Sequence, residues 1–382
     1  MINTQPYTSR LALAAALLVA VPSFIPHVAI AQEITTLAIG APAPDFLLPG
    51  ADGKDYRLSD FASAKLLVVV FTCNHCPTAQ AYEDRIKALH KDYQDRGVAL
   101  VAISPNDPQA VRLDELGYTD VGDSLDDMKL RAQAADFRFP YLFDGKTQAV
   151  SRAYGAKATP HVFVFDDQRR LRYQGRIDDN DIKPPTSLDT RNALDALLAG
   201  RDISVPQTRV FGCSVKWSDK QDSAAQSLAK WNLEPVELTE IDEQRLVEIA
   251  RNKTEKFRLI NVWATWCGPC LQELPELVEM HRMYRKRHFE IITLSMDDVD
   301  MKQRALQVLK DTHASTQNYL STIEDKDKLA ESLDAKWSGP LPYTILIAPG
   351  GKIVYRCEGA FDALELKRAI VQHIGRTYAS KK

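Results

Sequence analysis

The stretch Phe257-Arg-Leu-Ile-Asn-Val-Trp-Ala-Thr-Trp-Cys-Gly-Pro-Cys-Leu-Gln-Glu-Leu-Pro275 decides the fold of the C-terminal half of this 382-residue chain. It begins with an apolar run typical of a buried strand, and a helical pattern follows Cys267 and Cys270. At the N-terminus of a helix, unpaired backbone N–H groups favour a thiolate, which is the nucleophile of disulfide exchange. The spacing places the second sulfur on the same helical face, where it can resolve a mixed disulfide.

A second motif with the same spacing, Cys73-Asn-His-Cys76, stands in a similar context. It follows the apolar run Leu66-Leu-Val-Val-Val-Phe71, and a helical pattern comes after it. In both halves an X-Pro pair precedes a later apolar run, first Thr159-Pro160 and then Leu341-Pro342. Alternating strand and helix patterns are typical of an α/β protein, and the length allows about two domains. The sequence therefore predicts one α/β fold, a central mixed sheet flanked by helices, that occurs twice.

Composition sets the broad class of the protein. The chain is 45% hydrophobic and 26% charged, which is ordinary for a globular protein, and its formal net charge is -3. This charge gives no electrostatic indication of a nucleic-acid partner, and no long run of one sign suggests an acidic or basic tail. We expect a first domain over residues 32–218, a polar linker over 219–235 and a second domain over 236–382.

The first 31 residues have the pattern of a signal peptide. Arg10 precedes the apolar run Leu11–Val21, and the small residues Ala29-Ile-Ala31 follow like a cleavage site. The alternative is a membrane anchor, but prolines interrupt the run, which is shorter than the roughly 20 residues needed to span a bilayer. We expect cleavage near Ala31 and a periplasmic or secreted protein, in a compartment where disulfides persist.

Both halves resemble the thioredoxin-like superfamily. Residues 238–375 are similar to thiol-disulfide oxidoreductases of the TlpA/ResA type through Trp263–Pro275. Residues 39–217 resemble peroxiredoxin-like redoxins of the AhpC/TSA type through Gly40–Phe46, Cys73–Pro77 and Gly212–Trp217. The resemblance implies an enzyme that exchanges dithiols and disulfides without a bound cofactor. It also implies disulfide-bearing client proteins and a membrane thiol electron donor as partners.

The resemblance further implies roles for single residues. Cys73 and Cys267 would be the attacking thiols, and Cys76 and Cys270 the resolving thiols. The peptide bonds Thr159-Pro160 and Leu341-Pro342 would be cis, and the backbone before each proline would pair with substrate. An ordinary trans turn is the alternative for both prolines.

Each of three further side chains has two interpretations, one functional and one purely structural. His75 either stabilises a thiolate as a cation or is an exposed helix residue. Glu273, which follows Cys270 on the predicted helix, either tunes a cysteine or is an exposed acid. Trp266 either contacts substrate or only packs. We expect Cys213 and Cys357 to be small buried hydrophobic residues, and Cys213 has a second interpretation as an auxiliary thiol of the first site.

The sequence thus favours an exported protein-disulfide oxidoreductase in which the C-terminal site passes electrons to the N-terminal site. Two independent domains are the alternative to this relay. A thiol peroxidase with antioxidant activity is another, because Cys76-Pro77-Thr78 matches the active-site segment of peroxiredoxins, although Cys73 and Val69 depart from that pattern. A copper- or zinc-binding thiol chaperone is the third, since Cys-x-x-Cys is also a metal-ligand spacing. We favour no metal.

Overall fold

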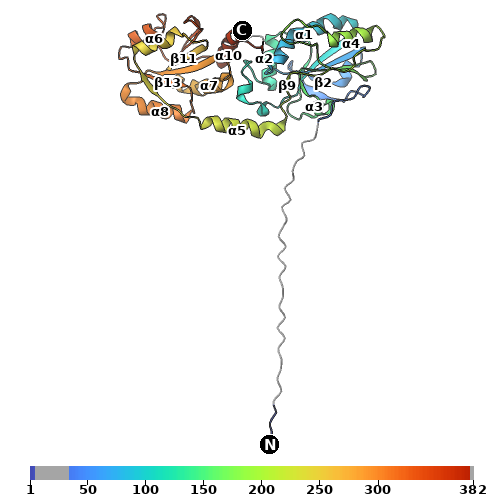
Figure 1. Ribbon diagram of the computed structural model, residues 1–382, viewed down its shortest axis with the longest axis horizontal. Helices are drawn as coiled ribbons and strands as arrows, with labels where there is room; N and C mark the ends of the chain where they lie inside the picture. The colour runs from blue at the N-terminus through green and yellow to red at the C-terminus, as the bar shows by residue number, and fades with distance from the viewer. Residues whose placement is uncertain (5–33, 379–382) are drawn as a thin grey trace. The chain divides into compact units, whose positions relative to one another are not determined.

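The computed structural model describes residues 1–4 and 34–378. The expected signal peptide and its cleavage site near Ala31 fall largely on residues 5–33, outside the described residues. Ile34–Lys382 forms one compact unit, and its strands belong to two separate main sheets (Figure 1). Among the described residues, no helix combines the length and the apolar character needed to cross a membrane.

The N-terminal half contains a five-stranded mixed sheet in the order β5-β4-β3-β7-β8, with β3 parallel to β4 and antiparallel to β7. Two smaller sheets pair β1 with β2 and β6 with β9. The strands are β1 Leu47–Pro49, β2 Asp55–Arg57, β3 Leu66–Phe71, β4 Val98–Ser104, β5 Tyr141–Phe143, β6 Ala158–Thr159, β7 His161–Phe165, β8 Leu171–Gly175 and β9 Cys213–Ser214. The α-helices are α1 Pro77–Tyr93, α2 Leu125–Ala134, α3 Ala149–Tyr154 and α4 Asp189–Leu198. The 3-10 helices are η1 Leu58–Phe61, η2 Gln94–Arg96, η3 Pro108–Ala110 and η4 Leu113–Glu115.

The C-terminal half contains a six-stranded mixed sheet in the order β10-β13-β12-β11-β14-β15. β11 is parallel to β12 and antiparallel to β14, as β3 is to β4 and β7. The strands are β10 Thr239–Ile241, β11 Phe257–Trp263, β12 Phe289–Ser295, β13 Gln317–Ser321, β14 Tyr343–Ile347 and β15 Ile353–Glu358. The helices are α5 Gln221–Asn232, α6 Glu243–Arg251, α7 Gly268–Tyr284, α8 Lys302–Asp311, α9 Lys326–Leu333 and α10 Ala363–Ile374, with 3-10 turns η5 Ser218–Lys220 and η6 Val299–Met301.

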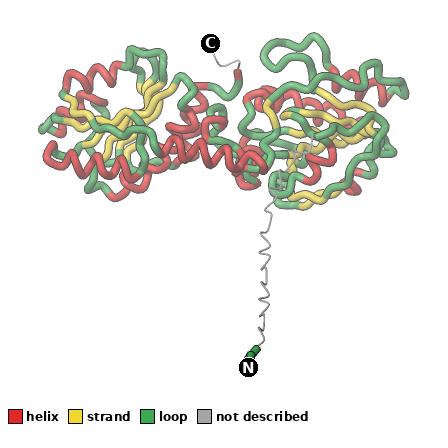
Figure 2. Tube along the Cα trace, turned by 60° about the horizontal axis from the view of Figure 1, so that its bottom comes forward, coloured by secondary structure: helices red, strands yellow, loops and turns green. Residues whose placement is uncertain are grey.

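Each central strand is buried on both faces because helices cover both sides of its sheet (Figure 2). Alternate residues of a strand point to opposite faces. In β3, the side chains of Leu66, Val68 and Val70 enter one hydrophobic cluster, while those of Leu67 and its alternate neighbours enter the other. A continuous apolar run is the sequence signature of such a strand. The predicted fold, two mixed sheets flanked by helices, is confirmed.

The stretch predicted as a polar linker, 219–235, is mostly helical. Helix α5 covers Gln221–Asn232, and this segment contains no proline or glycine that would break a helix. One end of α5 is fixed to α7: Arg282 Nη2 donates to Asn232 Oδ1 at 2.7 Å, and the Arg285 guanidinium lies 5.1 Å from the Trp231 ring centre. The segment expected to link the two domains therefore contains a helix without a long apolar stripe, stabilised by a few anchoring contacts.

Candidate active site

Both cysteine pairs follow the central strand of their sheet, where the chain turns into a helix. Cys73 and Cys76 lie between β3 and α1, and Cys267 and Cys270 follow β11 at the start of α7. The bonds Thr159-Pro160 and Leu341-Pro342 are both cis, as predicted. Each cis-proline directly precedes the strand that pairs antiparallel with the central strand.

The strand register shows that the two motifs are not equivalent. Phe71 pairs with His161, the residue after the first cis-proline, and Val262 pairs with Tyr343, the residue after the second. Five positions beyond Phe71 is Cys76, whereas five positions beyond Val262 is Cys267. The second cysteine of the first motif therefore occupies the place of the first cysteine of the second motif.

The helix starts agree with this register. Cys76 is the N-cap of α1 and its sulfur accepts from Ala79 N at 3.4 Å. Cys267 is the N-cap of α7 and its sulfur accepts from Cys270 N at 3.3 Å. Cys73 lies three residues before the helix cap, and Pro77, favoured in the first turn, starts α1 directly after Cys76, in agreement with the helical pattern expected after the motif.

The second site is a disulfide at the surface end of α7. Cys267 and Cys270 are bonded, with their Cα atoms 5.3 Å apart. Both cysteines are buried, while the preceding Trp266 is 69% exposed. Leu341, before the cis-proline, is partly buried and packs against the two hydrophobic clusters of this half. The exposed indole is thus an apolar surface directly beside the cysteine at the helix cap.

Glu273 is buried, which excludes the alternative that it is an exposed acid. Its carboxylate accepts from Asn261 Nδ2 at 2.6 Å and from Phe361 N at 3.4 Å. Burial raises the pKa of Glu273 to about 7, against the lowering effect of these two hydrogen bonds. A carboxyl group with such a pKa can give or take a proton near neutral pH.

The first site is a group of reduced, buried cysteines around Thr159. Cys73 and Cys76 are 3% and 0% exposed. Cys73 Sγ lies 3.1 Å from Thr159 Oγ1, and Cys76 Sγ lies 3.4 Å from Thr159 O. Thr159 therefore contacts both sulfurs, one through its hydroxyl and the other through its backbone.

His75 is a buried member of a hydrogen-bond network, not an exposed helix residue. Its Nδ1 lies 2.5 Å from Asp123 Oδ2, and Asn106 Nδ2 donates to the same oxygen at 2.7 Å. Burial lowers the pKa of His75, but the negative charge of Asp123 outweighs this effect and raises it. The pKa of Asp123 is lowered by His75 in spite of burial. Each member of the pair thus favours the charged form of the other.

This charge distribution makes Cys76 the thiolate of the first site. Burial raises its pKa, but hydrogen bonds from Cys213 and Cys73, the positive charge of His75 and the Ala79 N–H together lower it well below the ordinary value. The pKa of Cys73 is raised, first by burial and then by its hydrogen bond to Cys76. Both the helix cap and the electrostatics thus favour Cys76 as the nucleophile.

Three residues of the first site escaped the sequence analysis or were left open there. Asp123 and Asn106 lie in loops far from the cysteines in sequence, and their roles arise only from packing. Cys213 contacts the cluster of Cys73, Cys76 and Ala79. Its place in Gly212–Trp217, a segment already singled out by its resemblance to redoxins, was the available signal.

Cys73, His75 and Asp123 present potential metal-ligand atoms within 4.8 Å of one another. The carboxylate oxygens of Asp123, however, already accept from Asn74 N, His75 N, His75 Nδ1 and Asn106 Nδ2. These four donors take up the lone pairs that a metal would need. The arrangement fits a hydrogen-bonded charge network, and we assign no metal to it.

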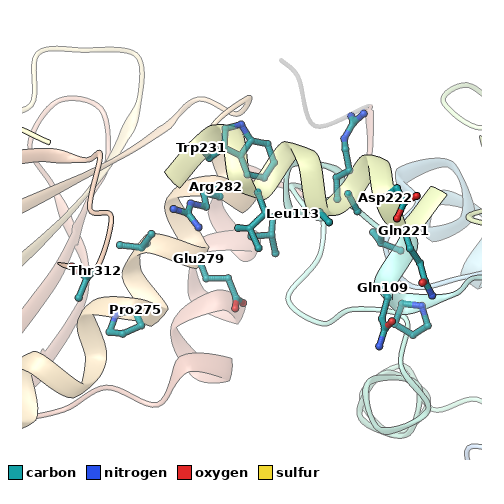
Figure 3. A pocket seen from close by; sticks show the side chains of 16 residues that line it. Gln109, Leu113, Gln221, Asp222, Trp231, Pro275, Glu279, Arg282 and Thr312 are labelled. Atoms are coloured by element: carbon teal, nitrogen blue, oxygen red, sulfur yellow. The ribbon is translucent and has the colours of Figure 1, made fainter. Parts of the chain in front are cut away.

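One large cavity is not lined by any of the cysteines. It measures about 670 Å³ and lies among α5, α7 and the η3–η4 segment, with Trp231, Pro275 and Glu279 in its wall (Figure 3). Its lining contains neither a cysteine nor a buried charge network. We therefore place the candidate active sites at the two helix caps and not in this cavity.

Comparison with curated proteins finds thiol-disulfide oxidoreductases that are similar to part of the chain. The chain is 31% identical over 109 residues to the thiol-disulfide oxidoreductase ResA of Oceanobacillus iheyensis, which covers 28% of this chain and 53% of that protein. The ResA of Geobacillus thermodenitrificans is 30% identical over 109 residues, with 28% and 58% covered. The chain thus spans little more than half the length of these relatives.

Among solved structures, two similar chains have no described activity. A hypothetical protein from Sinorhizobium meliloti is 36% identical and covers 48% of this chain and 97% of its own, with a TM-score of 0.43. An uncharacterized conserved protein from Geobacillus kaustophilus is 38% identical, covers 47% and 93%, and has a TM-score of 0.43.

The family model named AhpC/TSA matches the chain twice, at residues 39–174 and 230–356. The two matched regions contain both central strands, both helix-cap cysteines and both cis-prolines. Together they cover more than half of the chain, and we conclude that it belongs to the AhpC/TSA family.

Proposed function

We propose that the protein is a thiol-disulfide oxidoreductase that acts on protein substrates through two unequal cysteine sites. One observation at both sites carries the proposal. A cysteine sulfur caps a helix, at Cys76 or Cys267, and a second cysteine lies three residues away in the sequence. Such a pair can attack a disulfide and then resolve the mixed disulfide without a bound cofactor. The ResA relatives, which carry this activity in their name, support the proposal for the C-terminal site.

The roles of the cysteines follow from the helix caps. At the second site Cys267 attacks and Cys270 resolves. At the first site the roles expected from sequence are exchanged in this proposal: Cys76 attacks and Cys73 resolves, because Cys76 has the helix cap and the lowered pKa. Trp266 and the backbone before Pro342 would contact the client of the second site.

The location of the protein and its partners are also proposals. We infer an exported protein with disulfide-bearing clients and a membrane thiol electron donor, supported by the signal-like pattern of residues 1–31 and by dithiol chemistry. Within the molecule, the C-terminal site would reduce the N-terminal site. The buried imidazolium of His75 stabilises a thiolate over a disulfide, which makes the first site the more oxidising of the two.

A second candidate function is a thiol peroxidase at the first site. A low-pKa Cys76 at the cap of α1, next to Pro77, is an arrangement that favours attack on a small oxidant. The buried position of Cys76 also excludes large substrates more than small ones. In this second function too, the C-terminal site would reduce the N-terminal site.

Reduction of insulin disulfides by dithiothreitol separates these functions. Cys267→Ser should lower the catalysed rate about tenfold or more, because the helix-cap nucleophile is lost. Cys357→Ser, on edge strand β15, is the matched control and should resemble the unmodified chain. Equal rates in all variants would refute the oxidoreductase proposal, and peroxide consumption by Cys73→Ser that disappears on removing Cys76 would assign peroxidase activity.

The relay predicts a trapped intermediate in Cys270→Ser. The fully reduced variant, treated with one equivalent of diamide, should contain a peptide in which Cys267 is disulfide-bonded to a first-site cysteine, since the resolving thiol is absent. Peptide mapping under non-reducing conditions checks this, and the same variant with Cys76→Ser serves as control. A free Cys267 in monomers would show that the two sites do not exchange electrons.

The network at the first site predicts the effect of Asp123→Asn. Without the carboxylate, burial lowers the pKa of His75, the imidazolium is lost at neutral pH, and the pKa of Cys76 should rise by about one unit or more. Thiolate absorbance is followed against pH in a chain that keeps only the cysteines of the first site. Asp126→Asn, an exposed acid of α2, is the control, and an unchanged Cys76 titration in Asp123→Asn would contradict the assignment.

Glu273 predicts a pH-dependent stability. Its folded pKa of about 7 exceeds the ordinary 4.5, so the folded state holds a proton that the unfolded state releases between these values. The free energy of unfolding should therefore fall on the order of 3 kcal/mol as pH rises through this window. Glu273→Gln should remove that fall in urea unfolding, whereas Glu331→Gln, an exposed acid on α9, should keep it. Identical pH profiles of Glu273→Gln and the unmodified chain would refute the raised pKa.

A further inference from the structure

Strand β9 brings a third cysteine to the edge that carries the first cis-proline. Cys213 pairs with Thr159, and Ser214 pairs with Ala158, in an antiparallel arrangement. Gly212 has φ +140, and a Cβ atom at that position would lie 2.1 Å from Thr159 O. Only glycine allows this close approach, so the segment fits tightly against the backbone beside the active cysteines.

The residues after Cys213 fix the strand in place. Val215 is buried, and Lys216 N donates to Asn106 Oδ1 at 2.9 Å, which joins the segment to the His75 network. The Lys216 ammonium lies 2.6 Å from Glu115 Oε1. Cys213 is therefore held at the site by buried backbone and side-chain contacts.

The three sulfurs of the first site differ in access to solvent. Cys73 and Cys76 are almost completely buried, while Cys213 is partly exposed and packs against both of them. Cys213 is also a hydrogen-bonded neighbour of Cys76. Of these three residues, Cys213 is therefore the one that is partly open to a protein partner.

We propose that Cys213 is the third redox thiol of the first site, and the one through which this site exchanges disulfides with protein partners. The inference rests on the proposed thiol-disulfide exchange at Cys76 and deepens it. Through Cys213, the buried pair Cys73 and Cys76 gains a connection to the protein surface that neither cysteine has by itself. Strand β9 is then part of the active site.

The proposed exchange consists of successive thiol-disulfide steps, in each of which one S–S bond forms and one breaks. In the oxidised site, the Cys213 thiolate attacks the Cys76 sulfur of the Cys73–Cys76 disulfide, forming Cys76–Cys213 and releasing Cys73, which takes the proton that Cys213 lost. The first thiol of a partner dithiol then gives its proton to solvent and attacks Cys213, forming a mixed disulfide and releasing the Cys76 thiolate. The partner's second thiol attacks its own bonded sulfur, which releases Cys213, and this accepts the second thiol's proton. One disulfide is reduced and one partner dithiol is oxidised.

In the partner step, the leaving group supports attack at Cys213. A thiolate of low pKa leaves faster, and the pKa of Cys76 is lowered whereas that of Cys213 is raised by its hydrogen bond to Cys76 and by burial. An attack on Cys213 in the Cys76–Cys213 disulfide therefore expels the better leaving group.

The first test asks whether the new disulfide forms. The full chain with Cys267, Cys270 and Cys357 changed to Ser keeps only the three cysteines of the first site. In this background, Cys73→Ser treated with one equivalent of diamide should yield a Cys76–Cys213 peptide in non-reducing mapping. Monomers in which Cys213 remains a free thiol would overturn the proposal, and this result does not depend on substituting Cys213.

The second test measures reduction of the oxidised three-cysteine chain by reduced thioredoxin and by a small phosphine. Cys213→Ser should slow reduction by thioredoxin about tenfold or more but change reduction by the phosphine less than about twofold. Equal rates with thioredoxin would overturn the inference. If the oxidised three-cysteine chain is not reduced by thioredoxin at all, the proposed function of this site fails as well; if it is reduced and Cys213→Ser has no effect, only the inference fails.

Discussion

The register between the central strand and the strand after the cis-proline fixes the chemistry of each half. Burial on both faces holds β3 and β11 in place, and the antiparallel neighbours β7 and β14 bring a cis-proline to the same level in each sheet. A helix begins five residues beyond the paired position, so its cap is the site where a sulfur meets free N–H groups. Cys76 and Cys267 occupy that site.

The two halves use one scaffold for different electrostatics. The residue before the helix-cap sulfur is a buried histidine paired with Asp123 in the first half and an exposed tryptophan in the second. The second half has its titrating acid on the helix itself, at Glu273, where burial alone raises the pKa. The sites therefore differ in charge, in access and in the element that provides the proton.

Local patterns predicted the elements of the fold and the position of the cysteines after the central strands, and the family resemblance implied both cis-prolines. These patterns did not show that the two motifs differ in register, because identical Cys-x-x-Cys spacing hides a three-residue offset that only the strand pairing reveals. Asp123 and Asn106 could not be found from spacing either, since their loops reach the site through tertiary packing. The helical conformation of 221–232 depends on contacts with α7 that a polar composition does not indicate.

The exposed indole of Trp266 has a practical consequence. It adjoins the Cys267–Cys270 disulfide, while the position before Cys76 holds a histidine, which does not fluoresce in the same range. Disulfides quench nearby indole emission, so opening the second disulfide should brighten Trp266. The molecule thus carries an intrinsic optical signal for the redox state of one site, with which the flow of electrons between the halves can be timed without an added label.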